Sequence, residues 1–153
     1  MTRESKRERT TSYEEKGTWI YLAVAIAGYS FYLSRVLPEF LAGTPVDEID
    51  YVPVMLWTIG GAIVASIIAR IIIEIIVPSE SYKSDVRDKE IDRLGERVGS
   101  VFIVIGALGA LVLALVDADT FWIANVIYLC FVLSAILSSV TKLIVYRRGM
   151  PTW

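Results

Sequence analysis

The chain has 153 residues, enough for one domain, and 55% of them are hydrophobic while 21% are charged. A charged fraction close to that of soluble proteins, combined with a mean hydropathy of +0.56, requires the two kinds of residue to be segregated, and long apolar runs indicate membrane spans. Histidine is absent and Cys130 is the only cysteine. The composition therefore excludes a Ser-His-Asp triad, a His-paired cysteine nucleophile, His-ligated zinc or haem and an internal disulfide.

The first half of the chain contains two apolar runs. Residues 1–17 are polar and mixed in charge, which predicts a cytoplasmic tail rather than a cleaved signal peptide. The first run, 18–37, has the roughly 20 residues that a bilayer core requires and ends before Pro38. The second run, 52–77, is long enough that it must tilt or protrude from the hydrocarbon. We therefore predict two spans joined by an acidic loop.

The second half begins with a charged segment. In residues 82–97 apolar side chains recur at helical spacing, which predicts an amphipathic cytoplasmic helix that leads into the third run, 98–116. A tight turn follows, with Asp119 as the predicted N-cap, and leads to the fourth run, 121–145. The chain is thus expected to cross the membrane four times.

The distribution of charge predicts the orientation. Of the 15 basic residues, all except Arg35 lie on the side of the two termini and of the segment between the second and third spans. By the positive-inside rule both termini are cytoplasmic, including the short C-terminal tail, 149–153. The predicted fold is all-α, an integral membrane bundle of four transmembrane helices over residues 18–148.

Small and hydroxyl residues recur every four positions along three of the spans, which suits close helix packing in lipid. The second span has Gly61, Ala65 and Ala69 beside Thr58, Ala62, Ser66 and Arg70, the third has Gly95, Gly99, Gly106, Ala110 and Ala114, and the fourth has Ser134, Ser138 and Lys142. We expect these stripes to pack an antiparallel bundle in which sequence neighbours are spatial neighbours, or one stripe to face a second copy. Asn125 is expected to form an interhelical hydrogen bond, and Cys130 to be a small buried hydrophobe.

Charged residues inside a span are candidates for function. Arg70 and Glu74 lie one turn apart on the same helix face, and Lys142 in the fourth span is expected at a similar depth. They predict an intramembrane polar cluster of Arg70, Glu74 and Lys142 that holds a lipid headgroup, an ion or a partner. The alternative is a self-neutralised pair of Arg70 and Glu74 at the cytoplasmic interface, within reach of water.

The charged segment carries two parallel rows of like charge, which we call the cytoplasmic charged ridge. Its acidic row is Asp85, Asp88, Asp92 and Glu96, and its basic row is Lys89, Arg93 and Arg97. Like charges four apart repel each other by a few tenths of a kcal/mol, so the ridge invites a partner. It is either a solvated helix with internal ion pairs or a surface that docks a tail or a second subunit. A metal site is not expected, because no glycine-shaped acidic loop is present.

The stretch Asp85-Val-Arg-Asp-Lys-Glu-Ile-Asp-Arg-Leu-Gly-Glu leads directly into a span. Together with Pro53-Val-Met-Leu-Trp-Thr-Ile-Gly and Phe121-Trp-Ile-Ala-Asn-Val, it resembles a group of small bacterial four-helix integral membrane proteins without an assigned activity, which have an Asp-x-Arg-Asp-like stretch before the third span. The resemblance implies the same topology in the bacterial cytoplasmic (inner) membrane. It transfers no catalytic or binding residue.

These observations favour a non-enzymatic integral membrane protein that acts through self-association or a membrane protein partner, using the cytoplasmic charged ridge. Its expected partners are membrane lipids and a second copy or another membrane protein, with no nucleic acid and no cofactor. The alternative is a small transporter or channel with its polar site around Arg70 and Glu74. A lipid-processing enzyme is disfavoured, because its acids would have to act without any histidine.

Overall fold

The computed structural model describes residues 13–76 and 86–149, and in these ranges every regular element is a helix. The helices are α1 (Tyr13–Leu41), α2 (Tyr51–Ile76), α3 (Val86–Leu115) and α4 (Thr120–Arg148). Each contains a stretch long and apolar enough to cross a membrane. The predicted all-α fold of four membrane-spanning helices is confirmed, and it fits a multi-pass integral membrane protein.

α1 extends beyond the predicted first span at both ends. α1 begins at Tyr13, inside the predicted tail, and continues beyond Pro38 to Leu41. Pro38 is tolerated because it lies near the end of the helix, where its missing N–H removes a single backbone hydrogen bond. The amphipathic segment and the third span form one continuous helix from Val86. Residues 82–85 of that predicted segment lie outside the described residues.

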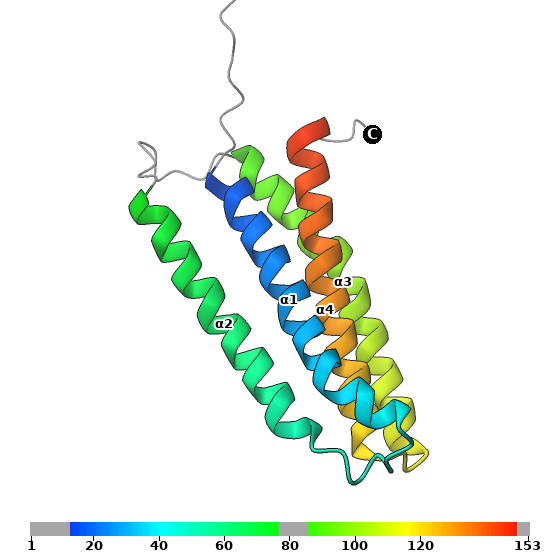
Figure 1. The fold of residues 1–153 in the computed structure, drawn as a ribbon. Helices are drawn as coiled ribbons and strands as arrows, with labels where there is room; N and C mark the ends of the chain where they lie inside the picture. Colours follow the sequence, from blue (N-terminus) through cyan, green and yellow to red (C-terminus); the bar gives the residue numbers. More distant parts are fainter. Residues whose placement is uncertain (1–12, 77–85, 150–153) are drawn as a thin grey trace, which may run out of the picture.

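The helices are arranged in the order α2, α1, α4, α3 (Figure 1). α3 and α4 share the most extensive interface, and α1 packs against both α2 and α4. The expectation that sequence neighbours pack together therefore holds for α1 with α2 and for α3 with α4. It does not hold for α2 with α3, which have at most marginal contact, because α1 lies between α2 and the α3–α4 pair.

The alternating directions of the helices give the bundle two distinct ends (Figure 1). The starts of α1 and α3 and the ends of α2 and α4 lie together, and we call this the charged end. The opposite end, the loop end, contains the connections 42–50 and 116–119. Arg35, in the half of α1 next to the loop end, is the one basic residue that the sequence places near that end. The segregation of basic residues along the sequence therefore becomes a difference in charge between the two ends of the bundle.

The buried core lies in the half of the bundle near the loop end. Its members come from α1, α2, α4 and the first connection: Tyr32, Val36, Ile49, Tyr51, Phe121, Tyr128 and Val132. The ring of Tyr128 meets the rings of Tyr29 and Tyr32 edge-on, with centroids 5.3 and 5.1 Å apart. Such edge-to-face pairs each add about 0.5–1.5 kcal/mol beyond the area that they bury.

Polar groups within this core pair across helices. The Tyr32 hydroxyl donates to Oδ1 of Asn125 at 2.7 Å, joining α1 to α4. The Tyr128 hydroxyl donates to Oγ1 of Thr58 at 3.0 Å, joining α4 to α2. Because a bilayer interior offers no water to an unpaired polar group, these bonds fix which helices meet. The interhelical bond predicted for Asn125 is confirmed.

The turn between α3 and α4 is closed by two aspartates. Asp117 adopts a left-handed backbone with φ of 53°, which aspartate tolerates better than most residues. Oδ1 of Asp119 accepts a hydrogen bond from the backbone N–H of Phe121 at 2.7 Å. Asp119 is therefore the N-cap of α4, as predicted.

Glycines allow α3 to approach α4 closely. A Cβ atom at Gly99 would lie 2.8 Å from the backbone oxygen of Ser134, and one at Gly106 would lie 2.5 Å from Cβ of Cys130. Neither position has room for a side chain. The small-residue stripe of α3 is thus occupied by α4 within the same chain, and Cys130 is buried as predicted.

Candidate functional site

A cleft of about 710 Å³ opens at the charged end, with residues from all four helices in its wall. We call it the charged-end cleft. Its polar lining is Thr18, Ser66, Arg70, Asp92, Glu96, Ser100, Ser134, Ser138, Ser139 and Lys142. The rest of its lining is Gly17, Ile20, Tyr21, Ile67, Ile103, Phe131 and Ala135. The cleft exists because α2 does not close against α3.

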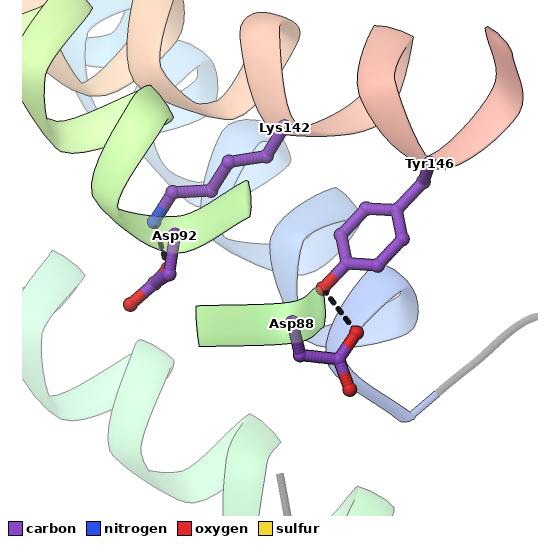
Figure 2. A network of polar contacts seen from close by, with 4 residues as sticks. All are labelled: Asp88, Asp92, Lys142 and Tyr146. Atoms are coloured by element: carbon purple, nitrogen blue, oxygen red, sulfur yellow. Dashed lines mark hydrogen bonds and ion pairs between the residues drawn. The ribbon is translucent and has the colours of Figure 1, made fainter. Parts of the chain in front are cut away.

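An ion pair between α3 and α4 forms part of the wall. Nζ of Lys142 bonds to Oδ1 of Asp92 (Figure 2). Gly95, one turn after Asp92, makes room for it, because a Cβ there would lie 2.6 Å from Cγ and Cε of Lys142. The Lys142 side chain is 18% exposed and that of Asp92 is 59% exposed. Water therefore screens the pair, and its contribution to stability is at most about 1 kcal/mol.

A second polar contact extends this interface toward the ends of the helices. The hydroxyl of Tyr146 donates to Oδ1 of Asp88 at 3.2 Å (Figure 2). Asp88 and Asp92 are one turn apart on α3, and Lys142 and Tyr146 are one turn apart on α4. The acidic row of the charged ridge therefore packs against α4 in the same chain.

The two rows of the charged ridge have different surroundings. Asp92 and Glu96 line the charged-end cleft, whereas the exposed basic row, Lys89, Arg93 and Arg97, lies outside it. Asp85, the first acid of the ridge, lies outside the described residues. The sequence suggested a tail or a second subunit as partners of the ridge. The structure pairs two of its acids, Asp92 and Asp88, with Lys142 and Tyr146, which were not predicted as partners, and the predicted docking stays a prediction.

The predicted intramembrane cluster is placed only in part. Arg70 and Lys142 line the same cleft, one from α2 and one from α4. Glu74 belongs to α2, but its side chain lies outside the described residues. The mutual contact of Arg70, Glu74 and Lys142 thus stays a prediction.

A cation–π contact holds α1 to α4 at the charged end. The guanidinium carbon of Arg147 lies 5.4 Å from the centre of the Trp19 ring. Trp19 lies near the start of α1 and Arg147 near the end of α4. Their contact follows from the pairing of α1 with α4, which the sequence does not show.

The charged-end cleft is suited to holding a polar group. Its wall contains two carboxylates, two basic side chains and several hydroxyls beside apolar residues. It therefore offers positively charged hydrogen-bond donors, negatively charged acceptors and neutral hydroxyls. Within residues 13–76 and 86–149, no three Cys, Asp or Glu side chains are placed to hold a metal ion together.

No protein-family model, no curated protein and no solved structure matches this chain. The resemblance to small bacterial four-helix membrane proteins therefore stays a prediction.

Proposed function

We propose that the protein is a non-enzymatic integral membrane protein of the bacterial cytoplasmic membrane that acts by self-association, with both termini in the cytoplasm. The observation that carries this proposal is the uncovered face of α2. α2 packs against α1, and a Cβ atom added at Gly28 of α1 would lie 3.8 Å from Cβ of Ala62 on α2. Gly60 and Gly61 on its other faces have no such neighbour within 4 Å.

The contrast with α3 supports an interface between copies. The glycines of α3 that form a stripe are filled by α4, whereas Gly61 and Ala65 on α2 remain exposed. Helices associate in lipid where small residues let their backbones approach, so a second α2 fits this face. A single copy leaves the face to lipid.

The charged ridge supplies a second contact in the same proposal. Its exposed basic row, Lys89, Arg93 and Arg97, suits an acidic segment of the partner at the membrane surface. Asp88 and Asp92 are poor probes of this contact, because both bond to α4 within the chain. Reversing the charge of Arg93 and Arg97 tests it without breaking those bonds.

The experiment compares oligomeric state for matched leucine variants of the full chain in nanodiscs and by native mass spectrometry. Gly61→Leu and Ala65→Leu should each weaken the dimer by roughly tenfold or more, since one lost close approach costs on the order of 1.4 kcal/mol. Ala107→Leu, on an exposed position of α3, is the control and should leave the dimer intact. A strictly monomeric protein, or a dimer insensitive to both α2 variants, contradicts the proposal.

The transporter or channel reading is less well supported. It needs a polar path across the membrane, but the charged-end cleft stops at one end of the bundle. Tyr32, Tyr128 and Val132 fill the interior near the other end. The absence of histidine from the sequence further supports a non-enzymatic role.

A further inference from the structure

We propose that the charged-end cleft binds the headgroup of a zwitterionic phospholipid with a primary ammonium group, of the phosphatidylethanolamine class, whose acyl chains leave between α2 and α3. This inference is independent of self-association. It rests on the charge, depth and shape of the cleft.

The charges in the cleft match a zwitterion. Arg70 and Lys142 are balanced by Asp92 and Glu96, so the four side chains sum to zero. An anionic headgroup would meet two carboxylates, and a simple cation would meet two basic groups. A phosphate beside an ammonium group satisfies both signs at once, and it does so without leaving an uncompensated charge.

The geometry separates the two halves of the headgroup. Lys142 bonds to Asp92 between α3 and α4, so these two form a closed wall. Arg70 on α2 lines the opposite side of the cleft and is the proposed phosphate contact, because a guanidinium binds phosphate oxygens through two parallel hydrogen bonds. Glu96, one turn after Asp92 on α3 and about 6 Å further from the charged end, receives the ammonium group, which reaches inward from the phosphate.

Three of the four charged groups lie at one depth, and Glu96 lies one turn deeper on α3. Arg70 is six residues before the end of α2, Lys142 six before the end of α4 and Asp92 six after the start of α3, each about 9 Å along its helix. Interfacial layers of roughly 5–7 Å flank the hydrocarbon on each side of a bilayer. Helix ends that protrude a few ångströms beyond this layer place Arg70, Lys142 and Asp92 at the level of the phosphates and glycerol groups of the surrounding lipid.

The apolar part of the cleft points toward the hydrocarbon. Ile67 lies one turn deeper than Arg70, and Ile103 lies two turns deeper than Glu96. Phe131 adds an aromatic ring from α4. The gap between α2 and α3 leaves this side open to lipid, and a volume of about 710 Å³ suits a headgroup with its glycerol rather than a whole phospholipid.

The test is native mass spectrometry of the delipidated full chain with phosphatidylethanolamine or phosphatidylglycerol of identical acyl chains. Phosphatidylethanolamine should be retained roughly tenfold more strongly, and Arg70→Gln and Glu96→Gln should each remove most of that preference, because a hydrogen bond to a charged group is worth a factor of about ten or more. Arg97→Gln and Glu90→Gln remove the same charges from α3 outside the cleft and should retain the lipid. Equal retention of both lipids, or an unchanged preference in both cleft variants, overturns the proposal.

A second arm separates a lipid from a soluble ligand of the same chemistry. Phosphoethanolamine without acyl chains should fail to displace the lipid at a tenfold molar excess, because it cannot use the apolar part of the cleft. Displacement at that ratio would overturn the assignment to a lipid. Lipid adducts are counted separately on monomer and dimer masses, so this result does not depend on the oligomeric state.

Discussion

Replacing Gly99 with alanine tests the close packing of α3 on α4. The added Cβ would lie 2.8 Å from the backbone oxygen of Ser134, 3.0 Å from Cβ of Ser138 and 3.1 Å from Oγ of Ser134. An ordinary van der Waals separation is about 3.5 Å, so the nearest contact is short by roughly 0.7 Å. Because that contact is with backbone, the helices have to move apart rather than a side chain rotating.

Gly60 provides the matched control. It lies in the middle of α2, and a Cβ there meets nothing within 4 Å. Both substitutions gain about 1 kcal/mol of helix propensity, so this gain cancels when the two variants are compared. What remains is the cost of overpacking at Gly99, about 1–3 kcal/mol. Gly99→Ala should therefore be less stable than Gly60→Ala by that amount.

The measurement is thermal unfolding of the full chain in a mild detergent, followed by tryptophan fluorescence. For a protein of this size, about 1–3 kcal/mol corresponds to a Tm lower by roughly 3–9 °C in Gly99→Ala than in Gly60→Ala. Equal melting temperatures would refute the inference that the α3 glycines are required for contact with α4. A Tm of Gly60→Ala below that of the unsubstituted protein would show that something packs against α2 at Gly60.

Three further predictions use the same unfolding measurement. Tyr32→Phe should cost about 0.6–1.7 kcal/mol, because it leaves Asn125 without its interhelical donor, and an unchanged Tm would show that this bond contributes nothing. Lys142→Met and Asp92→Asn should each cost at most about 1 kcal/mol and the double variant no more than either alone, whereas additive losses would mean that the pair does not act as a unit. Gly43→Ala should cost about 1–2 kcal/mol because the residue has φ of 83°, and a gain in stability would contradict that backbone conformation.

The four spans could be predicted because their signal is local. Each span is a long apolar run, and the charged segments between the spans are stable only in water or among lipid headgroups. The N-cap of α4 was equally local, since Asp119 acts on a backbone N–H two residues away. Asn125 could be assigned a role but not a partner, because an amide in lipid must pair with something and the sequence does not say what.

The arrangement of the spans could not be predicted, because it depends on which stripes meet. Lys142 was grouped with residues of α2 by depth alone, yet it bonds to Asp92 on α3. Gly95 was the available signal: a glycine one turn after an acid leaves room for a long basic side chain to cross the helix. The start of α1 at Tyr13 was missed because a polar segment gives no apolar pattern, although its residues are compatible with a helix.

The hydrogen bonds between the tyrosines and their partners join residues that are synthesised at different times. Tyr32 is synthesised 93 residues before Asn125, and Thr58 is synthesised 70 residues before Tyr128. The Thr58 hydroxyl has a hydrogen-bond partner before Tyr128 is synthesised, because it donates to the backbone oxygen of Met55 in its own helix. The partner of Tyr32 lies on α4, so we expect docking of the second hairpin, α3 with α4, to complete the polar pairing of the first, α1 with α2.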